Sequence, residues 1–466
     1  MPKANSFTAK KPFLVILKAL ILLSPLPFGC VGKIFSPFFF LLLSIVTFLG
    51  LKQPADQHVI LHVILYEKWL HRFYYGFLIF LAFQVIPLPM SVLKILSPKT
   101  VDILAALGDP LPAFHTISLV PFETMVYGCQ FLVFSLFFQA MIHIELGRRE
   151  MISLVNVLVL AAMMQVIFGF LKYIQGNRYF FLFFHPYNES EILRYRLTGT
   201  LGNSDHFAFY LEMILPPALA LFFLKLRVFD RSMPLREKFP AIAGEFKSIV
   251  FYFIAAVLLG IGIILTGSRG GVSTMILSII IFVLFSAFLG ISTEIRRKLK
   301  IMFILILLGV LSVGLQETVA RLLKTNIEAE NRFNARWPGT VTMISDFPLL
   351  GTGFGTFRYA YYLYDHEQGN RWTTHAHNDY LEILSDGGIT GGFVFLFLTG
   401  MIILSFYKTW WQRRRPEIKM LGLGIMVSLF AVTFHSVFDF SLRIPSNMFV
   451  FVLLLALGMR MAHYHK

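Results

Sequence analysis

The chain has 466 residues, of which 56% are hydrophobic and only 14% are charged, and its formal net charge is +15. Soluble proteins are charged at about a quarter of their positions, so this composition excludes an ordinary soluble domain. The basic residues are spread over separate short connections, which argues against a nucleic-acid-binding surface and favours contact with anionic lipids.

Apolar runs recur along the chain, and each is long enough to cross a hydrocarbon core of about 30 Å at 1.5 Å per residue. They predict spans near 12–29, 34–51, 72–89, 122–143, 152–173, 205–224, 248–267, 271–291, 301–316, 387–407, 420–438 and 447–463. We therefore expect an all-α polytopic membrane protein with about twelve transmembrane helices in a single domain over residues 1–466.

Lys and Arg are concentrated in alternate connections, including Lys10-Lys11, Arg148-Arg149 and the runs 296–300 and 413–415. Because cytoplasmic loops are enriched in basic residues, this pattern places both termini in the cytoplasm. The first apolar run leads into a second one without a clear small-x-small site, so we expect an uncleaved first helix.

Cys30 and Cys129 are isolated within apolar runs. Their spacing predicts neither a disulfide framework nor a metal site.

The longest polar segment, 317–386, separates the ninth and tenth expected spans on the outer side. It contains a glycine-rich stretch, 351–357, and then tyrosines 359, 361, 362 and 364. Loops of this length are uncommon unless they are functional or disordered, and the glycines and aromatic residues argue against disorder and favour a folded, partly helical cap. The tyrosines suit either the membrane interface or stacking on sugars.

Two shorter outward segments carry arginine, against the general charge pattern. One contains Arg196, and the other is the tight link 266–271, with Ser268 before Arg269. Ser268 is placed to cap the next helix, and arginine suits bidentate phosphate contact. A snorkelling side chain or an ordinary turn is the alternative for Arg269.

Several motifs together resemble the O-antigen ligase and polymerase superfamily. They are Arg196-x-x-Gly199, Ser268-Arg269-Gly270-Gly271, Gly351-x-Gly353-x-Gly355-x-Phe357, His377-Asn378-x9-Gly388-x-x-Gly391 and His435-x-x-x-Asp439. The resemblance implies a metal-independent, inverting glycosyltransferase of the GT-C type without a cofactor. Such an enzyme moves a glycan from undecaprenyl diphosphate to an acceptor at the periplasmic face of the bacterial inner membrane.

The resemblance also implies roles for individual residues. His377 takes the place of the histidine that activates the acceptor hydroxyl, and Arg196 and Arg269 those of the arginines that hold the donor diphosphate. A neutral imidazole accepts a proton near physiological pH, which suits this role. The alternative for His377 is a structural histidine that pins the loop to the bundle.

Other residues receive supporting roles. Arg336 and Arg443 are further candidates for phosphate or sugar contact, and Asn378 is a candidate for substrate binding. Asn378 and Asp379 are also placed to cap a helix starting near Tyr380. Gly388 and Gly391 are interpreted as close-packing positions. His435 and Asp439 stand four apart, and we expect them to share a helix face and to hydrogen-bond each other.

The resulting hypothesis is an O-antigen ligase of lipopolysaccharide biosynthesis, joining glycan to lipid A-core. A polymerase using a second lipid-linked glycan and a protein O-oligosaccharyltransferase are the alternatives within the superfamily. A flippase or transporter is the alternative from another class, but it would carry charges deep in several spans or pseudo-repeated halves. A purely structural scaffold leaves the histidine motif unexplained.

Overall fold

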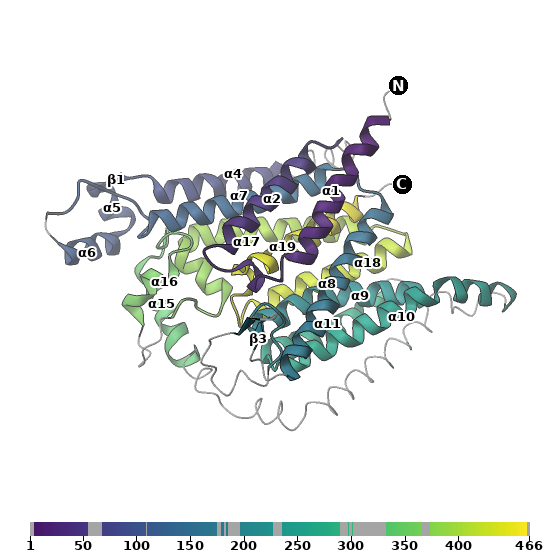
Figure 1. The fold of residues 1–466 in the computed structure, drawn as a ribbon. Coiled ribbons are helices and arrows are strands. Elements are labelled where there is room, and N and C mark those ends of the chain that lie inside the picture. Colours follow the sequence, from purple (N-terminus) through teal and green to yellow (C-terminus); the bar gives the residue numbers. More distant parts are fainter. Residues whose placement is uncertain are drawn as a thin grey trace.

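The computed structural model describes residues 4–54, 68–108, 110–174, 179–180, 183–184, 196–226, 235–288, 297, 301, 332–365 and 373–463. Helices dominate it (Figure 1). The long helices are α1 (Ala4–Leu23), α2 (Phe35–Leu51), α4 (Lys68–Val85), α7 (Pro121–His143), α8 (Arg148–Ile174), α9 (Ser204–Leu226), α10 (Leu235–Leu265), α11 (Arg269–Phe288), α17 (Asp379–Trp411), α18 (Pro416–His435) and α19 (Pro445–Ala462).

Every expected span except 301–316 coincides with one of these helices, and 301–316 lies outside the described residues apart from residue 301. Eight of the described helices are long and apolar enough to cross a membrane, and α2 is a shorter apolar helix. The chain is therefore an all-α polytopic membrane protein. The full count of twelve spans stays a prediction, as does the GT-C type.

Short elements complete the described chain. Between α4 and α7 lie β1 (Leu88–Pro89), α5 (Met90–Leu96), α6 (Pro98–Leu107) and β2 (Phe114–His115), with β1 antiparallel to β2. Elsewhere are η1 (Phe28–Cys30) and the antiparallel pair β3 (Tyr179–Phe180) and β4 (Phe183–Phe184). The helices α5 and α6 were not expected, because they are too short to produce a hydropathy signal.

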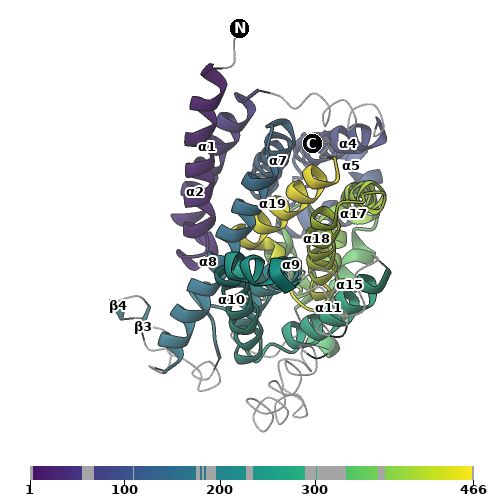
Figure 2. The ribbon, with the colours of Figure 1, turned by 90° about the vertical axis from the view of Figure 1, so that its right-hand side faces the viewer.

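The helices form a bundle with α9 and α19 inside it (Figures 1 and 2). Nearly all of α9 and α19 is buried, whereas most of α7 and α17 is not. Helix α9 packs against α18, α10, α11 and α8. Its apolar residues surround the whole helix, which is typical of a helix buried on every side.

The described part of the long polar loop is folded. It contains the π-helical turn η5 (Arg332–Arg336), α15 (Trp337–Asp346), α16 (Phe357–Ala360) and η6 (Tyr361–Tyr364). A further short helix, η7 (Ser441–Arg443), lies in the connection between α18 and α19. Tyr361 and Tyr364 are buried in a small core with Met343 and Phe357. These two tyrosines therefore stabilise the loop itself, which is neither of the expected roles at the membrane interface or in sugar stacking. Tyr359 and Tyr362, in contrast, are exposed.

Helix α17 is broken at Gly388, whose backbone has φ 60° and ψ −170°. At this break, backbone groups of α17 form hydrogen bonds with segment 348–355, here called the glycine loop. Ile389 N–H donates to Pro348 O at 2.8 Å, and Gly353 N–H donates to Asp386 O at 2.9 Å. A Cβ on Gly388 would lie 2.4 Å from the carbonyl carbon of Leu349, so the close-packing interpretation of Gly388 is confirmed.

Candidate active site

His377 lies at the junction between the polar loop and α17. Its backbone φ is +51°, in the left-handed region that non-glycine residues rarely adopt. The next residue, Asn378, caps α17, because its Oδ1 accepts hydrogen bonds from Tyr380 N–H and Leu381 N–H at 3.0 Å each. The capping role expected for Asn378 is therefore confirmed. Strained backbone of this kind concentrates at functional sites.

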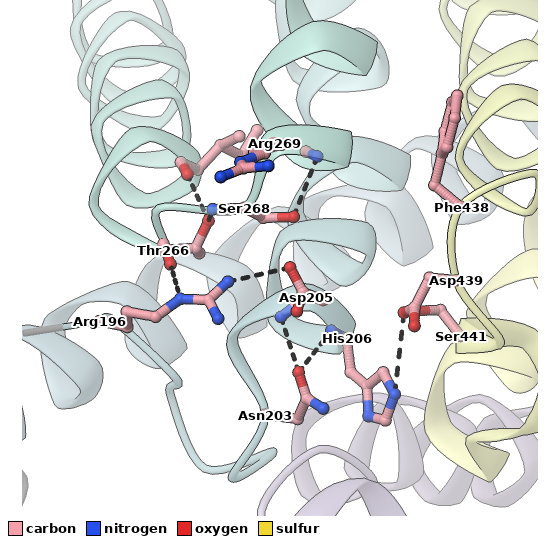
Figure 3. Close-up of polar contacts among 12 residues, drawn as sticks. Arg196, Asn203, Asp205, His206, Thr266, Ser268, Arg269, Phe438, Asp439 and Ser441 are labelled. Atoms are coloured by element: carbon pink, nitrogen blue, oxygen red, sulfur yellow. Dashed lines mark hydrogen bonds and ion pairs between the residues drawn. The ribbon is translucent and has the colours of Figure 1, made fainter. Parts of the chain in front are cut away.

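The carboxylate of Asp439 lies between two imidazoles. Its Oδ1 is 3.4 Å from His377 Nδ1. Its Oδ2 is 3.7 Å from His206 Nε2 on α9 (Figure 3). The Ser441 hydroxyl also donates a hydrogen bond to Oδ2. Burial by itself would raise the pKa of the Asp439 carboxyl, but the imidazoles of His206 and His377 outweigh burial and hold this pKa well below its usual range. Asp439 is therefore a buried anion suited to orient His377.

The expected pair between His435 and Asp439 is wrong. Helix α18 ends at His435, so the spacing of four does not place the two residues on one helix face. The partner of His435 is Glu212 on α9, with 3.0 Å between His435 Nδ1 and Glu212 Oε2. A Cβ on Gly270 would lie 2.8 Å from His435 Nε2, which explains a glycine at this position in α11. This contact set joins α9, α11 and α18.

Arg196 and Arg269 lie on the two sides of the link before α11 (Figure 3). Arg196 donates from Nε to Thr266 O at 2.8 Å and from Nη2 to Asp205 Oδ1 at 2.9 Å. Ser268 caps α11 as expected, because its Oγ accepts a hydrogen bond from Gly271 N–H at 3.1 Å. Arg269, the first residue of α11, is exposed. The fold thus brings the two expected arginines together and orients one of them with a carboxylate.

Arg332 is a site residue that the sequence analysis missed. Its guanidinium donates from Nη1 to Phe438 O at 2.7 Å, and its Nη2 is 3.3 Å from His377 Nδ1. A His377 tautomer with the proton on Nδ1 donates to Asp439, whereas the other tautomer accepts from Arg332. The first tautomer leaves the lone pair on Nε2, where a base would need it.

The neighbouring candidate Arg336 is buried within the loop. Its carbonyl oxygen accepts hydrogen bonds from Thr340 Oγ1 and Tyr361 Oη. The structure therefore places its backbone in the loop's own packing. A role for Arg336 in substrate contact stays a prediction.

Phe440 is surrounded by three histidines. His375 stacks on it with ring centroids 3.9 Å apart, and His377 and His206 approach it edge-on at 4.8 and 4.7 Å. His206, His375 and Phe440 come from three separate segments, so no spacing in the sequence indicates that they meet. Their contact links His377 to α9 on one side and to His375 on the other.

Arg443 lies beyond Phe440, among carboxylates. Its Nε is 3.4 Å from Glu382 Oε1, and its Nη2 is 3.1 Å from Asp386 Oδ2. Glu382 also pairs with His375 Nδ1 at 2.9 Å. Arg443 and His375 both line a cavity of about 760 Å³, whose lining does not include His377, Arg196 or Arg269. Arg443 is thus available to a ligand of this cavity, although two carboxylates already contact it.

Acidic and imidazole groups are abundant here, yet they do not converge as metal ligands. Among the residues that the structure describes, no three or more His, Cys, Asp or Glu side chains are grouped so that they could hold a metal ion. What the arrangement offers instead is an imidazole supported by a buried carboxylate, with two arginines on adjoining elements. These groups are suited to moving a proton and to stabilising an anion.

Comparison with known proteins agrees with this chemistry. A family model described as O-antigen ligase matches residues 254–396, which include Arg269, the glycine loop and His377. No curated protein matches the chain. The family match confirms the resemblance to the O-antigen ligase superfamily.

Proposed function

We propose that this chain, a member of the O-antigen ligase-like superfamily, transfers a glycan from undecaprenyl diphosphate to a hydroxyl of a membrane-anchored acceptor. The reaction takes place at the periplasmic face of the bacterial inner membrane. The observation that carries the proposal is the contact between His377 and the buried carboxylate of Asp439. The same carboxylate contacts His206, which follows in the chain the Asp205 that holds Arg196.

In the proposed reaction, Nε2 of His377 accepts the proton of the acceptor hydroxyl. The acceptor oxygen attacks the anomeric carbon of the donor sugar and forms the new glycosidic bond with inversion. The bond from that carbon to the diphosphate oxygen breaks, and the diphosphate leaves with the electron pair. Asp439 stabilises the imidazolium that forms, by attraction over the 3.4 Å that separates it from Nδ1.

Arg196 and Arg269 are proposed to bind the diphosphate and to stabilise the negative charge that grows on it. Asp205 holds the Arg196 guanidinium in position through one nitrogen. Two guanidiniums would replace the divalent cation that many sugar transferases use, so we propose a metal-independent reaction.

Two acceptors are consistent with this chemistry. Lipid A-core as the acceptor would make the protein a ligase, the activity that the family description names. A second polyprenyl-linked glycan would make it a polymerase. If the protein used a protein acceptor or transported the lipid-linked glycan, neither lipid product would form in the experiment that follows.

The test is transfer by the purified full-length protein in EDTA, with an undecaprenyl-diphosphate glycan and with or without lipid A-core. Product on lipid A-core identifies a ligase, and longer lipid-linked chains without lipid A-core identify a polymerase. Absence of both products overturns the proposed transfer to lipid acceptors. Loss of activity in EDTA that Mg²⁺ restores would contradict the metal-independent reaction.

A further inference from the structure

A buried histidine and a buried carboxylate meet where α18 ends. His435 Nδ1 lies 3.1 and 3.0 Å from the two carboxylate oxygens of Glu212 on α9. The exposed fractions of the two side chains are only 1% and 2%. Ionisable groups inside a membrane bundle are costly and usually serve a function. Replacing a buried pair of this kind with apolar residues often leaves stability unchanged, so helix packing alone does not account for it.

The pair packs against the first turn of α11, next to Arg269. A Cβ on Gly270 would lie 2.8 Å from His435 Nε2, and a Cβ on Gly271 would lie 3.0 Å from Glu212 Oε1. The α11 backbone therefore lies directly against both members of the pair. Arg269 is the first residue of α11 and immediately precedes these glycines. The position of its backbone consequently depends on the pair.

The residue after His435 connects the end of α18 to the start of α17. The carbonyl oxygen of Ser436 accepts a hydrogen bond from Asp379 N–H at 2.9 Å, and the Ser436 hydroxyl donates to Asp379 Oδ2 at 2.8 Å. Asp379 is the first residue of α17 and stands two residues after His377. Two consecutive residues thus contact both halves of the site, the turn that begins with Arg269 and the turn that follows His377.

We infer, on the basis of the proposed transferase function, that His435 is a positioning residue, held by Glu212, that fixes the separation between Arg269 and His377. It contacts neither substrate. The diphosphate at Arg269 and the acceptor hydroxyl at His377 must meet at one anomeric carbon, so a shift of either side chain misaligns attack and departure. Small displacements of reacting groups lower reaction rates strongly. Glu212 prevents the imidazole from turning away from α11, because both of its oxygens contact Nδ1.

The first test changes the contact between His435 and α11 from either side. His435→Asn keeps a nitrogen donor near Glu212 but has no atom at the position of Nε2, whereas Gly270→Ala adds a methyl group that meets Nε2. We expect each variant to lower kcat/KM for the donor by about tenfold and to leave the acceptor KM unchanged. The double variant should regain most of this loss, because the alanine methyl group fills the space that asparagine leaves. Gly260→Ala on α10 is the matched control, since a Cβ there has no atom within 4 Å.

A double-mutant cycle with Arg269→Lys separates positioning from packing. If His435 acts through Arg269, Arg269→Lys should reduce the donor kcat/KM less in the His435→Asn protein than in the unmodified protein. Equal reductions in both proteins would overturn the inference. A double variant of His435→Asn and Gly270→Ala that is as impaired as the product of the two single losses would overturn it as well.

Size-exclusion elution and helical circular dichroism identify any variant that fails to fold. In that case Glu212→Leu combined with His435→Leu takes its place, because exchange of both members of a buried pair is often neutral for stability. We expect the same loss of donor kcat/KM in this protein. Full donor kcat/KM would overturn the inference.

Amide hydrogen exchange provides a measurement that does not depend on transfer. The internal hydrogen bonds of the two turns begin at Val272 N–H in α11 and at Glu382 N–H in α17. Amides from these residues onward should exchange faster in His435→Asn, and Gly270→Ala should restore their protection in the double variant. Such changes in a protein that transfers no glycan would support the coupling of the two turns and contradict the proposed function. Transfer by the unmodified protein, with unchanged exchange in His435→Asn, would support the proposed function and overturn this inference.

Discussion

The imidazole of His377 has two partners for one nitrogen. Asp439 can accept a hydrogen bond from Nδ1, and Arg332 can donate one to it, at 3.4 and 3.3 Å. Only the first arrangement leaves Nε2 able to accept a proton. The choice of tautomer therefore depends on groups that lie far from His377 in the sequence.

Replacement of His377 removes the proposed base. We expect His377→Ala to reduce the transfer rate by about 10²- to 10⁴-fold, the usual contribution of general base catalysis. Donor binding should be retained, because the arginines lie on other elements. A radiolabelled donor checks both quantities, and His115→Ala on β2 is the matched control. Normal transfer by His377→Ala would remove the proposed role.

Asp439→Asn tests the positioning of His377. The pKa of the Asp439 carboxyl is depressed, so this carboxyl stays ionised throughout the neutral range. It contributes stability to the folded protein that is lost only as the pH falls below about 3.9, the ordinary pKa of an aspartate. In the proposed reaction, its negative charge attracts the imidazolium that forms when His377 accepts the acceptor's proton. We therefore expect the asparagine variant to lower kcat and to move the acid limb of the pH–rate profile to lower pH. A lower kcat with an unmoved acid limb would indicate a structural role alone.

The arginines are tested by lysine, which keeps the charge but lacks the bidentate fork. We expect Arg196→Lys and Arg269→Lys each to reduce kcat/KM for the donor by about tenfold, which corresponds to about 1.4 kcal/mol. Arg196→Lys also loses one of the contacts to Thr266 and Asp205. Initial rates against donor concentration measure the effect, with Arg297→Lys as the control. Full activity of the double lysine variant would contradict diphosphate binding by these two residues.

The sequence predicted the capping by Asn378 and Ser268 correctly because a cap depends on residues within one turn. It did not predict Asp439 as the partner of His377, or Glu212 as the partner of His435. These contacts join α9, α18 and the loop, and the end of α18 at His435 cannot be read from an apolar run that continues past it.

At the scale of elements, α17 and the glycine loop form one unit. The expected span began at residue 387, and the helix breaks at Gly388. Hydropathy located this boundary because the residues before it carry the carboxylates of the site. It did not reveal the hydrogen bonds that the loop supplies across the break.

Gly351→Ala tests that unit. Gly351 has a φ of +68°, and a Cβ there would lie 2.3 Å from Asp386 O. We expect a loss of stability greater than the roughly 1–3 kcal/mol that a strained backbone alone costs. Thermal unfolding in detergent provides the measurement. Gly32→Ala is the control, since Gly32 has φ +105° but no atom within 4 Å of its Cβ position. Equal melting temperatures for the two variants would contradict close packing at Gly351.

At the scale of the whole molecule, hydropathy located the helices but did not indicate which ones are central. Apolar side chains look alike in sequence whether they face lipid or protein, so the burial of α9 and α19 could not be predicted. The cavity beside His375 could not be predicted either, because its walls come from α2, α4, α7, α16, α17, η7 and α19.

Orientation in the membrane is a further prediction from the distribution of Lys and Arg. Tyr362 is exposed on the polar loop, so Tyr362→Cys should react with a membrane-impermeant maleimide applied from the periplasmic side. A cysteine introduced at Arg414 should react only after the membrane is opened. Both variants need a background without Cys30 and Cys129, which are free thiols. The reverse labelling pattern would invert the proposed topology.

The backbone hydrogen bonds between the glycine loop and the break in α17 limit how chimeric proteins can be built from this chain and a relative. Ile389 and Thr390 donate to carbonyls of the loop, and Thr352 and Gly353 donate back to residues 385 and 386. A graft that replaces the loop with one from a relative would separate these donors from their acceptors. Segments 348–355 and 385–390 must therefore be exchanged together in any such chimera.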